Sequence, residues 1–286
     1  MRKLIIIIAM MAASAVGFAQ VNASAAQPQN HSKRPDVRVI VGPSIAATDR
    51  SWRARIHYTY LQRDEDRRLD SHGLVKSDDV EVSTIIFFNG VPFEQLVEHN
   101  GRPPSPAEQR KQKDQLNKLK RETPEERVAR LRQEEEDNAS LVREVPLAFN
   151  FELIGEEVIN GRQAHVLQAT PNSGYHARGK YGGMFSKVKG KLWVDKEDFG
   201  WIKADGQVTQ PFSIGLFLAR VLPGSHITME QMRVGNGIWM PQHIEIRAAA
   251  KIFFIKSLIL DKVLTYSDYR PAQTGATTIG RNGAIP

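Results

Sequence analysis

The chain has 286 residues, a formal net charge of +7 and no cysteine. The absence of cysteine excludes a disulfide scaffold, a thiolate nucleophile, a cysteine zinc site and the acylated cysteine of a bacterial lipoprotein. A chain of this length can bury a hydrophobic core without disulfides, so one large domain, or one domain with an insertion, is expected. The mild basic excess is spread along the sequence and favours an anionic membrane surface or an acidic ligand.

The first 25 residues have the three parts of a secretory signal peptide. Arg2 and Lys3 form the positive start, and the almost unbroken apolar run Leu4–Val16 follows. Small residues then allow cleavage after Ala19 or after Ala25, and the sequence does not choose between the two sites. A membrane anchor would need about 18 or more apolar residues, which is more than this run offers. We therefore predict a periplasmic protein, secreted through a cleaved signal peptide, with a mature charge of +5 and no nucleic-acid partner.

The remainder divides into three parts by its apolar pattern. Residues 26–44 are polar with little periodicity and are expected to be a flexible N-terminal segment. Residues 45–270 carry the apolar pattern of a single domain. Residues 271–286 are rich in Gly, Ala, Thr and Pro, and we expect a disordered tail there.

Alternation of apolar and polar residues predicts antiparallel strands through most of this domain. The runs Trp52–Tyr60 and Val80–Phe88 are examples. Asn-Gly pairs, the favoured two-residue hairpin turn, join predicted strands at 89–90, 160–161 and 236–237. A fourth hairpin is expected from Gly190–Asp195 and Trp201–Thr209, and Lys256–Tyr269 is the closing strand. We expect eight to ten strands in an antiparallel sheet.

Two segments, residues 105–143 and residues 211–224, break this alternation. Ser105-Pro-Ala-Glu108 and Thr123-Pro-Glu-Glu126 are capping boxes with proline at the first helical position, so they predict consecutive helices over 105–121 and 123–143. Their acidic and basic residues are evenly mixed, which favours a solvated helical hairpin over a basic binding patch. The apolar segment Pro211–Gly224 is predicted to be a short helix on the concave face of the sheet.

A search for catalytic and metal-ligand patterns gives little. The eight histidines do not cluster in the sequence, and the pair His243 and Glu245 is interpreted as part of an exposed polar strand face. The acidic residues between Asp64 and Asp70 are interpreted as a solvated strand extension. No Gly-x-Ser-x-Gly motif and no Walker-type phosphate loop occurs. We therefore predict no enzyme, no catalytic residue, no metal site and no cofactor.

Aromatic and methionine residues are concentrated in the second half of the chain. They are ordinary core material, and a close-packed core is one interpretation. The other is a curved sheet whose inner face holds acyl chains, a use that suits adaptable methionine and aromatic side chains. On that interpretation the hydrophobic cavity is lined by Tyr58, Tyr60, Ile86, Phe88, Trp193, Phe212, Phe217, Met229 and Trp239.

Several short motifs resemble the periplasmic outer-membrane lipoprotein-sorting (LolA-like) superfamily. They are the strand Gly190–Asp195 with the return Gly200–Lys203, the run Ile238–Pro241 before His243–Ile246, and the ending Thr265–Arg270. The chain is more similar to other exported members than to the established lipoprotein carrier. The resemblance implies an incomplete barrel of antiparallel strands, lidded by helices, that holds lipid chains. The long charged pair of helices departs from the short lid helices of the family.

The expected fold class is α+β: a large curved antiparallel sheet, or incomplete barrel, with a helical lid and an inserted charged helical hairpin. The leading hypothesis for function is a non-enzymatic periplasmic carrier or binding protein for lipid or lipoprotein acyl chains, able to contact a membrane peripherally. The alternative is a structural or regulatory interaction module of the cell envelope, in which the helical hairpin over 105–143 binds a protein partner.

Overall fold

The computed structural model describes residues 36–272 except 89, 177–181, 215–218 and 253–255. The predicted signal peptide, residues 273–286 of the predicted tail and Phe217 lie outside these residues. In the described part of the chain, no helix has an apolar stretch long enough to cross a bilayer.

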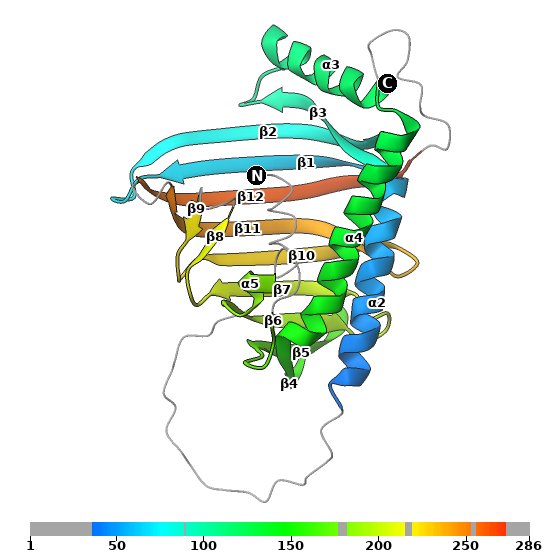
Figure 1. Cartoon of the computed structure of the whole chain (residues 1–286), viewed down its shortest axis with the longest axis vertical. Coiled ribbons are helices and arrows are strands. Elements are labelled where there is room, and N and C mark those ends of the chain that lie inside the picture. The colour runs from blue at the N-terminus through cyan, green and yellow to red at the C-terminus, as the bar shows by residue number, and fades with distance from the viewer. Residues whose placement is uncertain (1–35, 89, 177–181, 215–218, 253–255, 273–286) are drawn as a thin grey trace, which may run out of the picture.

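A single 12-stranded antiparallel sheet dominates the molecule (Figure 1). Its main path runs in the order β3-β2-β1-β12-β11-β10-β7-β6-β5-β4, so β3 and β4 form its two edges and the sheet is open rather than closed. The expected α+β class with an unclosed antiparallel sheet is confirmed. The strands on this path are β1 (Tyr58–Leu69), β2 (Val75–Phe88), β3 (Val91–His99), β4 (Phe149–Ile159), β5 (Arg162–Pro171), β6 (Val188–Asp195), β7 (Trp201–Val208), β10 (His226–Gly235), β11 (Ile238–Ile252) and β12 (Lys256–Pro271).

The predicted hairpins are all present. β2 and β3, β4 and β5, and β10 and β11 are antiparallel neighbours joined at the Asn-Gly positions, and β6 pairs with β7. Asn160 and Gly161 have φ values of 52° and 79°, and Asn236 and Gly237 have 31° and 72°. These are the positive values that a type I′ turn requires and that Asn and Gly tolerate best.

The charged helical hairpin is also confirmed. Helix α3 spans Pro106–Lys120 and α4 spans Pro124–Ala148. Both capping boxes are formed, by Ser105 with Glu108 and by Thr123 with Glu126. Helix α4 extends beyond the predicted Arg143 to the residue before β4, so helix and strand follow each other without a loop.

The prediction of a strand over Trp52–Tyr60 is wrong. Helix α2 covers Arg38–Ala54, a 3-10 turn η1 covers Arg55–His57, and β1 begins only at Tyr58. The helix also occupies the end of the segment 26–44 that was expected to be flexible. Its buried residues, Ile40, Ser44, Ala47 and Ser51, recur at helical spacing. Two of these four are serines, which hid the helical period from a purely hydrophobic pattern.

The prediction of a helix over Pro211–Gly224 is wrong for the residues that are described. Phe212–Ile214 forms β8 and Ala219–Val221 forms β9, which pair with each other. β9 also pairs with Ala250–Ile252 of β11, beyond the part of β11 that pairs with β10. Beyond its pairing with β10, this edge of β11 has backbone N–H and C=O groups that need hydrogen-bond partners. A strand such as β9 can supply these partners, whereas a helix cannot.

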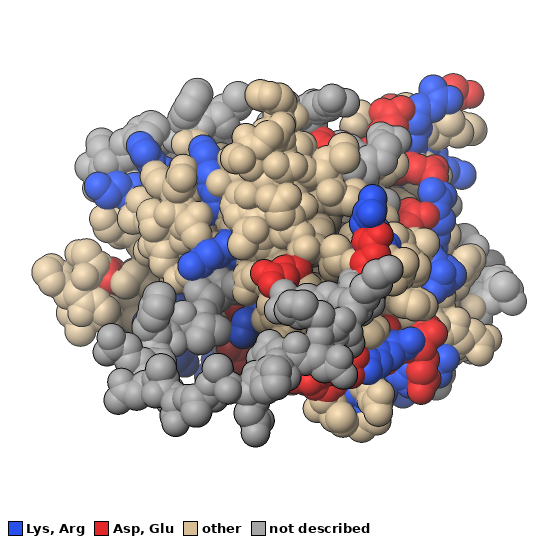
Figure 2. All heavy atoms as spheres, turned by 90° about the horizontal axis from the view of Figure 1, so that it is seen from below, with Lys and Arg blue, Asp and Glu red and all other residues tan. Residues whose placement is uncertain are grey.

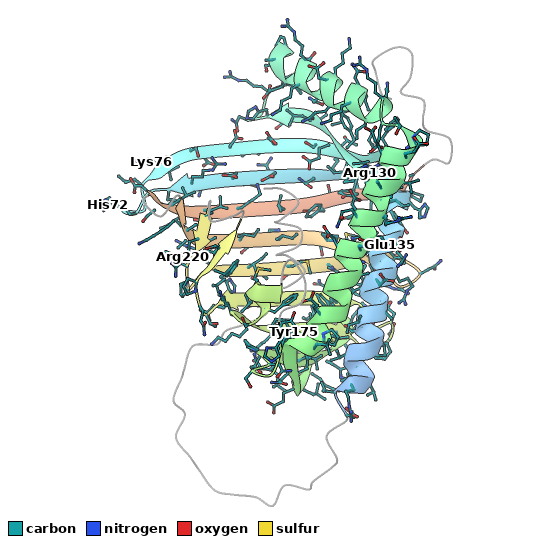
Figure 3. The ribbon with its side chains drawn as sticks, in the orientation of Figure 1. His72, Lys76, Arg130, Glu135, Tyr175 and Arg220 are labelled. Atoms are coloured by element: carbon teal, nitrogen blue, oxygen red, sulfur yellow. The ribbon has the colours of Figure 1, made fainter. Side chains whose placement is uncertain are left out.

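Helices α2 and α4 run side by side across one end of the strands on one face of the sheet, whereas α3 lies beside the edge strand β3 (Figure 1). Asn138 of α4 donates a hydrogen bond to Asp49 of α2, at 3.2 Å, and Arg53 of α2 pairs with Glu135 of α4. Figure 3 shows Arg130 and Glu135 at successive levels of α4. Arg130 binds Glu122 at the helix start, at 2.7 Å. The short helix α5 (Gly182–Phe185) packs near the end of α4.

Candidate functional site

The candidate site is the face of the sheet on which α2 packs, called here the helix-side face. A row of directly paired residues crosses this face from strand to strand, and each side chain in it is buried and apolar: Leu167, Leu192, Ala204, Met229, Ile244 and Leu264. Directly paired residues point to the same side of a sheet. Ile40 of α2 joins the same apolar cluster.

The row changes character at β1. Leu264 pairs with Asp64, Asp64 with Glu81 and Glu81 with His99. The neighbouring row makes the same change, from Ile227 and Ile246 to Lys262, Asp66 and Asp79. The helix-side face therefore has an apolar part on β5, β6, β7, β10, β11 and β12. Its charged part begins at Lys262 of β12 and continues over β1, β2 and β3.

A buried ion pair lies at the boundary between these parts. Lys262 Nζ contacts Asp64 Oδ1 directly and lies 3.6 Å from Asp66 Oδ2. The side chains of Lys262 and Asp64 are only 5% and 7% exposed. The interpretation of the acidic residues after Asp64 as a strand extension is confirmed, but Asp64 is not solvated. Pairing explains why a lysine and an aspartate are stable in this position.

Three tyrosines form the aromatic corner of the helix-side face. The ring of Tyr60 lies 4.9 Å from that of Tyr269 and 6.0 Å from that of Tyr266. Burial raises the pKa of Tyr60 to about 12, and it raises the pKa of Tyr266 and Tyr269 above the ordinary range. The Tyr269 hydroxyl donates to the Pro241 carbonyl at 2.6 Å. All three phenols are therefore neutral at physiological pH and act as largely apolar surface.

The predicted cavity residues do not gather on one face. Met229 lies in the apolar row, and Tyr60 packs at its margin. Trp193 and Trp239 belong to a cluster on the opposite face with Val166 and Ile202. Phe212 packs in a third cluster with Val188 and Val221. Ile86 and Phe88 alternate with Ile85, the partner of Tyr60, and so also point to the opposite face, whereas Tyr58 is half-buried outside the clusters. Phe217 is not described.

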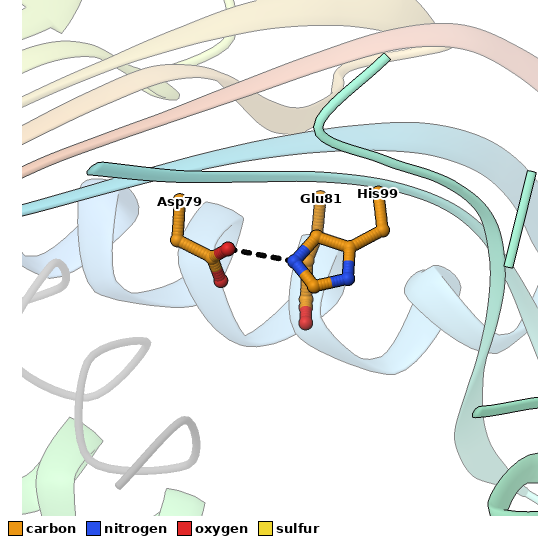
Figure 4. Close-up of side chains that lie close together, drawn as sticks. All are labelled: Asp79, Glu81 and His99. Carbon is orange, nitrogen blue, oxygen red and sulfur yellow. Dashed lines mark hydrogen bonds and ion pairs between the residues drawn. The ribbon is translucent and has the colours of Figure 1, made fainter. Parts of the chain in front are cut away.

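The charged part contains a cluster that the sequence did not suggest, shown in Figure 4. Asp79 and Glu81 of β2 and His99 of β3 have candidate ligand atoms that all lie within 4.8 Å of one another. The two carboxylates bonded to its ring, Asp79 and Glu108, raise the pKa of His99. The His99 bond in turn lowers the pKa of Asp79, while bonds from Ser105 lower that of Glu108 to about 2. The signal available in the sequence was Asp79-x-Glu81 on one strand face.

Lys262 was also missed, although the sequence contained a hint. It replaces an apolar residue in the alternating series Leu258, Leu260, Lys262, Leu264 and Tyr266 of β12. A charge at a core-facing position of a strand indicates a partner brought from elsewhere.

Side chains of both charges lie on the face of the molecule that Figure 2 shows. Seen from below, the end where β4 lies in Figure 1, blue and red side chains alternate between broader areas without charge (Figure 2). Ile154 and Val158 of the edge strand β4 are 46% and 69% exposed.

No protein-family model matches the chain, and no curated protein matches it. Among solved structures, the chain is similar to a DUF1329 family protein from Desulfovibrio piger, at 12% identity and a TM-score of 0.32, over 82% of this chain and 94% of that one. The chain is also similar to a putative outer membrane lipoprotein-sorting protein domain from Vibrio parahaemolyticus, at 14% identity and a TM-score of 0.32, over 82% of this chain and 94% of that one. A LolA superfamily protein from Nitrosomonas europaea is similar at 12% identity and a TM-score of 0.26, over 82% of this chain and 93% of that one. The names of the last two refer to the superfamily that the sequence resembles.

Proposed function

We propose that this protein is a non-enzymatic periplasmic carrier or binding protein for lipid or lipoprotein acyl chains. The observation that supports the proposal is the unbroken apolar row from Leu167 to Leu264 on one face of an open sheet. The row crosses six strands perpendicular to the strand direction, so an acyl chain lying along it would contact apolar side chains over its whole length. These side chains are buried in the structure, so the chain would replace part of the packing that covers them.

The energy of such binding comes from removing apolar surface from water. Burial is worth roughly 25 cal/mol per Å², or about 0.8 kcal/mol for each methylene group. Met229 at the middle of the row has a flexible thioether side chain that adapts to irregular ligands. The charged part of the same face, beginning at Asp64 and Lys262, would lie at one end of a chain bound along this row and would select its polar end.

The direct test is lipid binding by the mature protein. We expect lipid in organic extracts of the purified protein by mass spectrometry, and saturable uptake of a fluorescent fatty acid. Met229→Glu places a charge in the row and should abolish uptake, whereas the matched change Val158→Glu on exposed β4 should leave it unchanged.

Folding is the control for this test. Circular dichroism shows whether Met229→Glu is folded. If it is not, Ile244→Ala is the replacement variant, because it removes apolar surface from the same row without adding a charge and should weaken uptake. A folded wild-type protein with no extracted lipid and no uptake would contradict the proposal.

A second candidate is an envelope interaction module that binds a partner through α3 and α4. It is favoured by exposed apolar residues among the charges of α4, since Val128 is 56% and Leu131 is 38% exposed. The variant Val128→Asp distinguishes the two candidates. Crosslinking in the periplasm compares the proteins captured by the wild type and by this variant, and the uptake assay measures lipid binding by both. If the wild type binds no lipid but crosslinks to one defined protein, and Val128→Asp no longer crosslinks to that protein, the second candidate is favoured.

A further inference from the structure

The cluster of Asp79, Glu81 and His99 comes from two paired strands. Asp79 and Glu81 are two residues apart on β2 and so share a face, and the register places Glu81 opposite His99 at the end of β3. Their three ligand atoms lie within 4.8 Å of one another. Two ligands about 2.1 Å from a tetrahedral ion are about 3.4 Å apart, so small side-chain rotations would suffice for all three to bind one ion.

A second element fixes the orientation of the imidazole. Glu108 is the third residue of α3, and its Oε2 accepts hydrogen bonds from the backbone nitrogen and the hydroxyl of Ser105, at 2.7 and 2.6 Å. Its other oxygen, Oε1, contacts His99 Nδ1. The opposite ring nitrogen, Nε2, then faces Asp79 Oδ1 at 2.6 Å. Histidines that bind metals are commonly held in this way, with the non-ligating N–H donated to a carboxylate.

Asn100 also binds the Asp79 oxygen that faces His99. Asn100 Nδ2 donates to Asp79 Oδ1 at 3.0 Å, and Asn100 Oδ1 accepts from the backbone of Val80 at 2.8 Å. Asn100 itself has a φ of 50°, a conformation that asparagine tolerates better than most residues. The carboxylate is therefore positioned by the turn that follows His99.

The local charge favours a cation. Three carboxylates, those of Asp79, Glu81 and Glu108, surround one imidazole. Besides His99, Arg68 acts on Asp79, and Arg68 forms an ion pair with Asp66 at 2.9 Å. Without a metal, a protonated His99 would bridge Asp79 and Glu108. The register brings Glu81 to the same point as this bridge, so a third carboxylate is within reach of an ion bound there.

We propose that His99 Nε2, Asp79 and Glu81 bind a divalent transition-metal ion of the Zn²⁺ type, with Glu108 as the carboxylate that orients the histidine. One imidazole and two carboxylates suit Zn²⁺, whereas Ca²⁺ and Mg²⁺ prefer sites made of oxygen alone. Three protein ligands leave a fourth position for water. The ion joins β2 to β3 and, through Glu108, connects both to the start of α3.

The test is calorimetric titration of chelator-treated protein with Zn²⁺ alone, followed by Co²⁺ absorption spectroscopy to report the ligand geometry. We expect one equivalent to bind. His99→Ala should weaken binding at least 100-fold. The matched control is His226→Ala, because His226 forms a similar pair with Asp205 at 2.9 Å, but no third His, Asp or Glu among the described residues completes a metal-ligand group with them.

Two further variants separate a metal site from a simple ion bridge. Glu81→Gln should weaken Zn²⁺ binding about as strongly as His99→Ala, although it leaves the bonds of His99 to Asp79 and Glu108 intact. Glu108→Gln should weaken it by roughly 10–100-fold with the stoichiometry unchanged. Absence of one-equivalent binding, or unchanged affinity in folded Glu81→Gln or His99→Ala, would overturn the proposal. None of these outcomes depends on lipid binding.

Discussion

Asp195 shows how a single charged residue is stabilised inside the sheet. Its side chain is 1% exposed and receives two hydrogen bonds from Arg162, at 2.6 and 2.7 Å. Its Oδ1 also accepts from the backbone nitrogens of Glu197 and Asp198. Burial by itself would raise the pKa of Asp195, but the bonds from Arg162 and the backbone outweigh it and hold the pKa below the ordinary value. The carboxylate thus fixes the turn between β6 and β7.

Asp195→Ala should therefore lower the free energy of unfolding by about 3 kcal/mol, because it leaves Arg162 without its main partner and the turn nitrogens without an acceptor. Urea denaturation measures this loss. Glu197→Ala is the control: Glu197 also binds Arg162, but its side chain is 80% exposed, and its removal should cost less than about 1 kcal/mol. Equal losses in the two variants would contradict this account.

His165 on β5 gives a pH-dependent prediction. Burial lowers the pKa of His165, the nearby Lys196 lowers it further, and Glu156, 3.5 Å away, opposes both. The unfolded chain therefore binds this proton at a higher pH than the folded chain, and stability falls as the pH drops below the ordinary histidine value of about 6.5. His165→Gln should show a smaller loss of urea midpoint between pH 7 and pH 5 than the wild type. A larger loss in the variant would show that the sign is wrong.

At the scale of elements, α2 is attached to the sheet by two buried serines. Trp201 Nε1 of β7 donates to Ser44 Oγ at 2.5 Å, and the backbone nitrogen of Trp239 in β11 donates to Ser51 Oγ at 3.0 Å. Both serines are less than a tenth exposed. Serine at these positions gives the helix a defined position on the sheet that apolar packing alone would not specify.

Ser44→Ala should destabilise the protein by about 1–3 kcal/mol, since it leaves the buried indole N–H of Trp201 without an acceptor. Thermal unfolding measures the change. A double-mutant cycle with Trp201→Phe isolates the bond: Ser44→Ala should cost clearly less in the Trp201→Phe background. Additive losses would mean that the bond does not attach α2.

The elements also show where sequence patterns succeed. The capping boxes at Ser105 and Thr123 and the Asn-Gly turns depend on contacts within a few residues, so the printed order of residues is sufficient to predict them. The alternation of Trp52–Tyr60 fails as a predictor because the run crosses three elements, namely the end of α2, the turn η1 and the start of β1. There Arg55 lies over the ring of Trp52, at 3.6 Å, a contact between residues three apart.

At the scale of the molecule, the predicted export has a simple test. Expression of the full chain in a bacterial host should give a protein released with the periplasmic fraction, and sequencing of its first residues should begin at Gln20 or Ala26. The charge change Lys3→Glu together with Arg2→Glu should cause precursor to accumulate. An uncleaved chain that stays in the membrane fraction would instead indicate an N-terminal anchor.

The candidate site depends on long-range pairing much more than the elements do. Lys262 and Asp64 are 198 residues apart, and His99 reaches Asp79 across 20 residues and a hairpin. Spacing along the sequence could not find the contact of Lys262 with Asp64, because strand order sets which distant strands are neighbours. The Asn-Gly hairpin at 89–90 brings Asp79 near His99, but the register shift in this hairpin decides which residues are opposite. Aromatic and methionine content does not indicate which face of a strand a residue occupies, and Met229 and Trp193 of the predicted cavity lie on opposite sides of the sheet.

Composition and local pattern were sufficient to predict the class of the protein: an antiparallel sheet joined by tight turns, two capped and charged helices, and no cysteine chemistry. Each of these follows from local backbone preferences and composition. Only the tertiary structure decided that β1 lies between β2 and β12, so that an apolar row continues into Asp64, Glu81 and His99. The physical reason is that one hydrogen-bonding register, set over the whole sheet, decides which distant side chains share a face.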